Sequence, residues 1–471
     1  MKIVNLEIKG ITSNSKEIKK GFIFVAIKGN CQDGNRFIKE AITRGARIVV
    51  VEKEQPRIKV TGNVIFLVVN DCRKFFAQAT HNFYGTPSDK IRVVGITGTN
   101  GKTTISYLIE ALARKSGDHC GVIGTINYRF KGKKIIAKNT TPGAGQLQML
   151  LKRMHTQKVK YCAMEVSSHA LDQERVSGIN FSQAIFTNLT QDHLDYHKNL
   201  ENYFLAKAKL FCTLSARAKA IINNDDQYSK RIKRLTKAKV LTYGIKNKSD
   251  IMAKNINFGM QATEFSLVTS QINLRIKTKL IGRYNIYNIL AAVAWGISEK
   301  LPIQDIKIAL ENFKNVPGRL EGVNCSKGFG IFVDYAHTPD ALFNVISALR
   351  PLVKGKIIVI FGCGGERDKL KRPQMGKVVT ELADYAVITS DNPRSENPGQ
   401  IIKDIVQGIR KNNYCLVPSR AKAISKGLAL VNKDDCLLIA GKGHEDYQIL
   451  KNKVLKFSDR KVVLKCLKLM R

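Results

Sequence analysis

The segment that most restricts the fold is an apolar run at residues 90–97, KIRVVGIT, followed at once by the loop GTNGKTT and by a helical pattern from Ile105 to about Lys115. A short run rich in β-branched residues indicates a buried strand, and a strand–loop–helix unit is typical of parallel sheets covered by helices. Backbone N–H groups of such a loop bind phosphate, Lys102 can reach the β- and γ-phosphates, and a threonine hydroxyl can bind Mg²⁺. The strict motif has glycine where this chain has Ile96, so the loop is a variant. The segment therefore predicts a binding site for ATP or GTP.

The chain as a whole predicts an α/β protein of three domains. At roughly 150 residues per domain, a chain of 471 residues is long enough for three. Strand-like and helix-like segments alternate throughout, and breaks rich in Gly, Pro and Ser occur near residue 88 and at Pro317–Gly318. We predict a smaller α/β N-terminal domain at 1–88, a central P-loop ATPase domain with a parallel sheet at 89–316, and a Rossmann-like C-terminal domain at 317–471.

Composition and charge argue against several classes of protein. No segment has the ~20 uninterrupted apolar residues of a membrane span, and the N-terminal segment lacks the apolar core of a signal peptide, so we expect a cytoplasmic protein. Ten cysteines without a C-x-x-C pair indicate reduced thiols rather than zinc ligands or disulfides. A net charge of +40 would suit nucleic acid, but the lysines are spread over every segment, as an A+T-rich genome would produce. We therefore predict no nucleic-acid partner. A P-loop protein that binds nucleic acid is kept as the non-enzymatic alternative.

Polar or Gly-rich loops follow the strands of the second and third blocks. In the third block, IFVDYA, KIIVIFGCGG, DYAVITSDNP and DDCLLIAGKG each run straight into such a loop. Ligands of open parallel sheets bind at these carboxyl ends. In the central block, Glu165 ends the strand KYCAMEV, where a carboxylate directed at Mg²⁺ is expected. The segment TNLTQDHLDYH carries Asp192, His193, Asp195 and His197, and its residues alone leave open whether it binds a ligand or starts a helix.

Seven segments, spread over most of the chain, resemble those of the Mur ligases in the same order: GTNGKTT, MEVSSHALDQERV, TNLTQDHLDYH, YFLAKAKLF, GRYNIYN, VPGRLE and VDYAHTPDAL. The set is most similar to the member that adds 2,6-diaminopimelate to UDP-N-acetylmuramoyl-L-alanyl-D-glutamate. This resemblance implies a ligase of peptidoglycan biosynthesis that uses ATP and Mg²⁺ and forms an amide bond through an acyl phosphate. The implied partners are these two substrates, and a monomer is expected.

The resemblance also implies which residues act on ATP. Lys102, Glu165, His193 and Lys207 would be catalytic, and Mg²⁺ would be bound by Thr103, Glu165, His193 and Lys207. Lys207 matches the lysine that the family carries as a carbamate (N6-carboxylysine), whereas the sequence alone would make it a surface lysine of a helix. The nucleotide would be bound by Gly98, Thr99, Asn100, Gly101, Lys102, Thr103, Thr104, Asn285, Asn288, Arg319, Asp334, Tyr335 and His337.

The N-terminal domain would bind the UDP-linked precursor together with part of the central domain. By resemblance, the residues that contact the precursor are Ser15, Thr140, Thr141, Ser167, Gln173 and Arg175. Around Ser15 the family pattern is Asp-Ser-Arg, and this chain has Asn14 and Lys16 instead. Lysine lacks the two-pronged guanidinium of arginine, so the contacts with uridine are expected to differ.

The C-terminal domain would select the incoming amino acid. Its implied contacts are Arg367, Asp391, Asn392, Arg394, Gly441 and Glu445. Diaminopimelate differs from lysine by a carboxylate at its far end, which the Arg394 guanidinium can bind. Lysine has only an ammonium at that end, and the guanidinium would repel it. A sister ligase that adds D-glutamate, a dipeptide or folate glutamates is the alternative enzyme. Since substrates would come from all three domains, we also expect the third domain to close on nucleotide binding.

Overall fold

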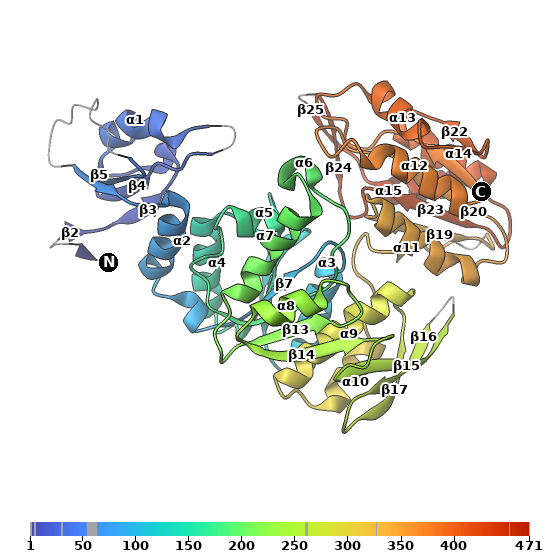
Figure 1. Ribbon diagram of the computed structural model, residues 1–471. Coiled ribbons are helices and arrows are strands. Elements are labelled where there is room, and N and C mark those ends of the chain that lie inside the picture. The colour runs from blue at the N-terminus through green and yellow to red at the C-terminus, as the bar shows by residue number, and fades with distance from the viewer. Residues whose placement is uncertain are drawn as a thin grey trace.

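Three sheets of four or more strands follow one another along the chain, as the dark-blue, light-blue-to-yellow and orange-to-red parts of Figure 1 show. This computed structural model describes residues 2–3, 6–29, 32–53, 64–259, 262–325, 327–451 and 453–470. The α/β class and the three-sheet organisation predicted from the sequence are confirmed. The domain limits at 88 and 316 stay predictions; the first falls within the 3₁₀ turn η3 (Pro87–Asp89) and the second between α10 and β18.

The N-terminal sheet is small and entirely parallel, with the strand order β3-β4-β5-β6. The apolar segments FIFVAIKG, ARIVVVE and VIFLVV contain β4, β5 and β6, and helix α1 ends at Thr43, two residues before Gly45. Gly45 has a positive φ of 100° and its N–H donates to the Ile42 carbonyl oxygen. The elements are β1 (Lys2–Ile3), β2 (Leu6–Glu7), β3 (Gly10–Thr12), η1 (Ser15–Glu17), β4 (Phe22–Val25), η2 (Gly34–Phe37), α1 (Ile38–Thr43), β5 (Ala46–Val51), β6 (Ile65–Val68) and α2 (Cys72–Phe83).

The central sheet has eleven strands, in the order β10-β9-β8-β11-β7-β12-β13-β14-β15-β16-β17. Its seven middle strands, from β8 to β15, are parallel, but β9–β10 and β16–β17 add antiparallel hairpins at the two edges. The predicted parallel sheet is therefore confirmed for the seven middle strands, and the edges add antiparallel strands. The strands are β7 (Arg92–Thr97), β8 (Cys120–Ile123), β9 (Asn127–Phe130), β10 (Lys133–Ile136), β11 (Tyr161–Glu165), β12 (Phe181–Phe186), β13 (Lys219–Asn223), β14 (Lys239–Gly244), β15 (Ile251–Phe258), β16 (Thr263–Val268) and β17 (Asn273–Thr278).

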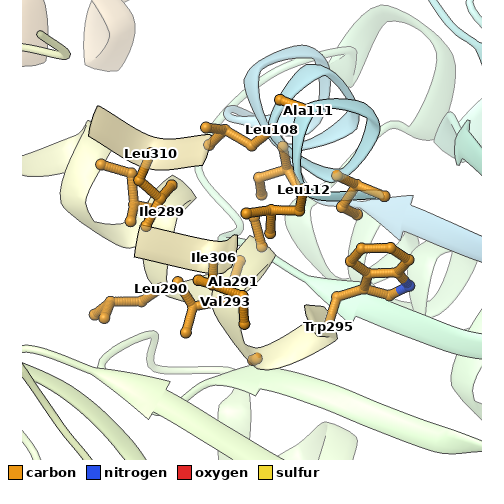
Figure 2. Packing of buried hydrophobic residues seen from close by; sticks show 14 of the residues in the cluster. Leu108, Ala111, Leu112, Ile289, Leu290, Ala291, Val293, Trp295, Ile306 and Leu310 are labelled. Carbon is orange, nitrogen blue, oxygen red and sulfur yellow. The ribbon is translucent and has the colours of Figure 1, made fainter. Parts of the chain in front are cut away.

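The helix after the P-loop is fixed by a large apolar cluster. Leu108 and Leu112 of α3 pack toward α9 and α10, where Trp295 and Ile306 are buried (Figure 2). Trp295 also meets the ring of Tyr161 edge-to-face at 5.1 Å, which connects the helices to β11. The start of α3 therefore lies on a rigid support. The central helices are α3 (Lys102–Lys115), α4 (Ala144–Thr156), α5 (Ser168–Asp172), α6 (Leu194–His197), α7 (Leu200–Cys212), α8 (Ser229–Leu235), α9 (Arg283–Ser298) and α10 (Ile303–Glu311).

The C-terminal sheet has the order β18-β19-β23-β20-β21-β22, and only β18 is antiparallel. The four segments predicted as strands form β19, β20, β21 and β23, so their carboxyl ends lie along one edge. The elements are β18 (Glu321–Gly322), β19 (Gly330–Asp334), α11 (Pro339–Leu349), η4 (Arg350–Leu352), β20 (Ile357–Phe361), α12 (Lys371–Leu382), β21 (Tyr385–Ile388), α13 (Pro398–Val406), β22 (Tyr414–Leu416), α14 (Arg420–Leu430), β23 (Cys436–Ala440), the antiparallel hairpin β24 (Tyr447–Leu450) and β25 (Lys453–Lys456), and α15 (Asp459–Leu469).

Two predictions from composition concern the whole chain. Among the described residues, no helix is long and apolar enough to cross a bilayer. The nine cysteines in the described ranges are all free thiols, as expected, and Cys31 lies outside those ranges.

Candidate active site between the central and C-terminal domains

A cavity of about 560 Å³ lies between the carboxyl ends of the central and C-terminal sheets. Loops that follow β7, β11 and β12 form one wall, and loops that follow β19, β20, β21 and β23 form the other. Most of the residues singled out in the sequence line it. They are Thr99, Asn100, Gly101, Lys102, Thr103, Thr140, Glu165, Ser167, His193, Lys207, Arg319, Tyr335, His337, Arg367, Asp391, Asn392, Arg394, Gly441 and Glu445.

The P-loop folds tightly between β7 and α3. The Lys102 ammonium donates to the carbonyl oxygens of Gly98 at 2.7 Å and Thr99 at 2.8 Å, and burial lowers the pKa of Lys102. Gly101 has a φ of 90°, and a Cβ there would collide with the Asn288 side chain. Asn288 in turn donates to Asn285 at 3.0 Å. These two asparagines therefore support the loop from behind instead of lining the cavity.

The Glu165 carboxylate is held by hydroxyl groups at the end of β11. Its Oε2 accepts from Thr103 Oγ1 at 2.9 Å and from Thr125 Oγ1 at 2.8 Å, and its Oε1 accepts from the Thr125 N–H at 3.1 Å. Thr104, which follows Thr103 on α3, is buried. The arrangement fixes a carboxylate directly beside the P-loop threonine.

Lys207 is buried, contrary to its reading as a surface lysine of a helix. Its side chain is 1% exposed, its Nζ donates to the Gly98 carbonyl oxygen at 2.9 Å, and it lies 4.4 Å from the centre of the Tyr203 ring. Burial and the nearby Lys102 ammonium hold the pKa of Lys207 well below its usual range. This environment favours the neutral amine, which is the nucleophilic form of lysine.

His193 and Asp192 lie side by side on the same wall. Nε2 of His193 is 3.5 Å from Oδ2 of Asp192. Loss of solvation lowers the pKa of His193 to about 3 in spite of this carboxylate. Burial alone would raise the pKa of Asp192, but His193 and Lys371 hold it well below its usual range. The pair thus offers a neutral imidazole and a charged carboxylate.

Arg319 reaches across from the C-terminal domain. Its Nη2 donates to Thr103 Oγ1 at 3.1 Å, and its guanidinium lies 4.6 Å from the centre of the Tyr335 ring. Asp334 is not one of the residues that line the cavity, and its carboxylate accepts from the N–H groups of Leu320 and Ala336. It therefore holds the two segments that carry Arg319 and Tyr335. Burial lowers the pKa of His337 to about 4, so this ring is neutral as well.

The far end of the cavity combines two guanidiniums with two carboxylates. Arg394 has a φ of 54° and donates to the Gly365 carbonyl oxygen at 2.6 Å. Burial, and then the neighbouring Arg367, lower its pKa. On the opposite strand end, Gly441 lies so close to Asp391 that a Cβ on it would be 2.7 Å from Oδ2. Glu445 completes this end.

The residues expected to bind the precursor are divided between two places. Arg175 donates to the Thr141 carbonyl oxygen at 2.9 Å and to Gln173 Oε1 at 3.0 Å, next to Ser167 at the cavity wall. Ser15 is not brought to the cavity. It lies in the N-terminal domain, where its hydroxyl donates to Glu40 at 2.8 Å.

Three sequence models of the Mur ligases match the chain in succession: "Mur ligase family, catalytic domain" at 7–84, "Mur ligase middle domain" at 96–296, and "Mur ligase, glutamate ligase domain" at 318–443. The UDP-N-acetylmuramoyl-L-alanyl-D-glutamate–2,6-diaminopimelate ligase of Clostridium botulinum is 43% identical over 98% of this chain and 95% of its own length. The ligase of the same name from Aquifex aeolicus is 44% identical over 97% and 93%. The chain belongs to the Mur ligase family.

Solved structures support this assignment for the Mur ligase fold. A structure described as UDP-N-acetylmuramoyl-L-alanyl-D-glutamate–2,6-diaminopimelate ligase has a TM-score of 0.70 and 31% identity, covering 98% of this chain and 95% of that one. The MurF ligase of Thermotoga maritima in complex with ADP has a TM-score of 0.65 over the full length of both chains at 20% identity, which shows a shared fold alone. The resemblance to the Mur ligases inferred from the sequence is confirmed.

Sequence reasoning missed Asp340 and Lys371, which also join the two walls of this Mur ligase. Asn100 of the P-loop donates to Asp340 at 2.8 Å, although the two residues are 240 positions apart. Lys371 lies 3.9 Å from Asp192, and both side chains are buried. Lys371 follows four residues after Arg367, and Asp340 lies three after His337, so proximity to a recognised motif is the signal that could have found them.

Proposed function

We infer that this ATP-dependent Mur ligase joins meso-2,6-diaminopimelate to UDP-N-acetylmuramoyl-L-alanyl-D-glutamate, the reaction of class EC 6.3.2.13 in peptidoglycan synthesis. The observation that carries the inference is that Arg367 and Arg394 line the same cavity as Asp391 and Glu445, and that this cavity also contains the P-loop. Diaminopimelate has a carboxylate and an ammonium at each end, and such a site can meet both charges. The curated relatives that carry this name are 42–44% identical over at least 97% of the chain.

The proposed chemistry has two steps that share the cavity. The γ-phosphoryl group of ATP passes to the γ-carboxylate of D-glutamate, which gives an acyl phosphate and ADP. The neutral amine of diaminopimelate then attacks the acyl carbon, and phosphate leaves. Phosphoryl transfer needs positioning and neutralisation of charge more than a covalent nucleophile. We assign the phosphates to Gly98–Thr104 with Lys102, and the rest of the nucleotide to a site completed by Arg319, Tyr335 and His337.

Mg²⁺ is proposed as the second cofactor, and the donors present fit it. Thr103 and Glu165 offer a hydroxyl and a carboxylate at 2.9 Å from each other, and His193 and Lys207 line the same cavity. Within the described ranges, no three His, Cys, Asp or Glu side chains form a ready-made metal cluster. Mg²⁺ normally binds through one or two carboxylates together with phosphates and water. When bound, the ion neutralises charge on the phosphates.

The precursor is proposed to run from the cavity to the N-terminal domain. Thr140, Thr141 and Ser167 would meet the peptide, with Gln173 and Arg175 behind them, and Ser15 would meet the uridine. Since ATP and UDP-linked precursors are cytoplasmic metabolites, we place the enzyme in the cytoplasm. We also expect the enzyme to act as a monomer. The contacts of Asn100 with Asp340 and of Asp192 with Lys371 would form as the C-terminal domain closes.

The reaction can be tested by ADP release with ATP, Mg²⁺ and UDP-N-acetylmuramoyl-L-alanyl-D-glutamate. We expect turnover with meso-diaminopimelate and little or none with L-lysine. Turnover with lysine instead would keep the ligase but contradict the role of the two arginines. Turnover with neither, but with D-glutamate or a dipeptide on the matching precursor, would identify a sister ligase.

Gly441 provides a test of the amino-acid end. In Gly441→Ala, the new Cβ would lie 2.7 Å from Asp391 Oδ2 at a φ of 111°, so Asp391 must shift. We expect KM for diaminopimelate to rise about tenfold or more, since a displaced carboxylate loses roughly 1–3 kcal/mol of charge-assisted bonding, while KM for ATP stays unchanged. The matched control is Gly117→Ala, which has a φ of 82° but no atom within 4 Å of the Cβ. Equal kinetic effects of the two substitutions would contradict the assignment.

A further inference from the structure

One lysine behind the amino-acid end of the cavity has no part in the function proposed above. Lys442 follows β23, its side chain is 0% exposed, and it does not itself line the cavity. Its ammonium donates to Glu445 Oε2 at 2.8 Å and to Asn392 Oδ1 at 3.1 Å. A buried ammonium is costly unless it is paired and hydrogen-bonded, so these contacts are a specific arrangement and not a chance meeting of surface groups.

The three side chains form a closed triangle. Asn392 Nδ2 donates to the same Glu445 Oε2 at 2.9 Å, and Asn392 Oδ1 also accepts from the Ile449 N–H at 3.0 Å. Lysine and a backbone N–H can only donate, so they define which atom of the Asn392 amide is the oxygen. Both Asn392 and Glu445 line the cavity. Lys442 does not line the cavity, but it sets the orientation of two side chains that do.

The hairpin β24–β25 continues this support. The Gln448 side chain donates to the Asp391 carbonyl oxygen at 2.7 Å, and the Arg394 N–H donates to the Ile449 carbonyl oxygen at 3.2 Å. The loop that carries Asp391, Asn392 and Arg394 is thus held from one side by the segment 442–451. Of these contacts, only that of Lys442 places a positive charge against a carboxylate of the site.

We propose that Lys442 is a positioning residue for the incoming amino acid, because it fixes Glu445 and Asn392 in the orientation that receives an ammonium group of the substrate. This inference rests on the proposed function, in which those two residues bind the amino acid. Without the ammonium, Glu445 would turn toward solvent or toward Arg394, and the Asn392 amide would lose its fixed orientation.

The test is steady-state kinetics of Lys442→Met, which keeps the volume of the side chain and removes the charge. We expect KM for diaminopimelate to rise roughly 10- to 100-fold, as for the loss of one charge-assisted hydrogen bond, with KM for ATP and for the UDP-precursor within about twofold of wild type. Lys219→Met is the matched control, since the Lys219 ammonium donates to the Ser298 carbonyl oxygen at 2.6 Å, far from this loop. If Lys442→Met does not fold, Lys442→Gln, which can still donate, takes its place with a smaller rise.

A double-mutant cycle separates positioning from general support of the fold. If Lys442 acts through Glu445, Lys442→Met and Glu445→Gln together raise KM for diaminopimelate little more than Glu445→Gln alone. Independent effects that multiply, or a KM for diaminopimelate within threefold of wild type in Lys442→Met, would overturn the proposal. Failure of the proposed function is seen separately, in the wild-type enzyme. If wild type uses another amino acid, KM for that amino acid becomes the readout for Lys442.

Discussion

Lys207→Ala is expected to lower kcat by roughly 10³-fold, the scale on which one preorganised charged group contributes to catalysis, and a short carboxylic acid such as acetate is expected to restore part of the activity. The reason lies in the surroundings of the amine. Lys207 is buried beside the P-loop carbonyl of Gly98 and beside Lys102, and its pKa is well below the usual range. A neutral amine can add its lone pair to the carbon of CO₂, and loss of a proton then leaves a carbamate.

Carbamate formation would replace the Lys207 amine, which is positive whenever it is protonated, by an anion beside the P-loop. Lys102 and the proposed Mg²⁺ are both positive, and a protonated Lys207 beside them would be a third positive group that opposes metal binding. An anion there would act as an additional oxygen ligand, as a carboxylate does. In Lys207→Ala, acetate can enter the space that the side chain leaves and supply the same charge.

Two further variants make this prediction specific. Lys207→Met should be as inactive as Lys207→Ala but should not respond to acetate, because the methionine side chain fills the space. Lys209→Ala, on the same helix α7, removes an exposed lysine that pairs with Glu174 at 3.1 Å and should leave kcat unchanged. Activity of Lys207→Ala near that of wild type without acetate would show that no carbamate is needed.

The P-loop was predictable because all of its determinants are local. The β-branched strand, the glycines and Lys102 lie within fifteen residues, and their role in binding phosphate can be inferred without knowledge of the fold. The helix itself begins at Lys102 and not at Ile105 as predicted, because Gly101 in the left-handed region is its N-cap. Lys102, Thr103 and Thr104 therefore belong both to the P-loop motif and to the first turn of the helix.

Residues that act across the domains were not predictable from any local pattern. Asp340 and Lys371 acquire their role only when the C-terminal sheet meets the P-loop, and Asp192 could be read equally well as the start of a helix. The edge strands were missed for a related reason. Strand β10 lies at the surface, and three of its four residues are exposed. It therefore lacks the continuous buried apolar run that marks the parallel strands in the sequence.

Arg394→Ala is expected to remove the preference for diaminopimelate over lysine. The partly buried Arg394 guanidinium lines the cavity next to the exposed Arg367, and two positive groups side by side are stabilised by a carboxylate between them. Loss of a paired, charge-assisted contact corresponds to about 2–4 kcal/mol, or roughly 30- to 1,000-fold in kcat/KM for diaminopimelate. For lysine, whose ammonium the guanidinium repels, kcat/KM should stay level or rise. The measurement is the ratio of the two kcat/KM values.

The conservative variant and a control decide how Arg394 acts. Arg394→Lys keeps the charge without the two-pronged geometry, so it should recover only part of the ratio. Arg460→Ala removes an exposed arginine of the same domain that lies 3.3 Å from Glu321, and should leave the ratio unchanged. If Arg394→Ala still discriminates as wild type does, selectivity must come from Arg367, and Arg367→Ala would then carry the larger loss. If neither substitution alters the ratio, no guanidinium binds the carboxylate at the far end of diaminopimelate. The main argument for diaminopimelate as the substrate then no longer holds.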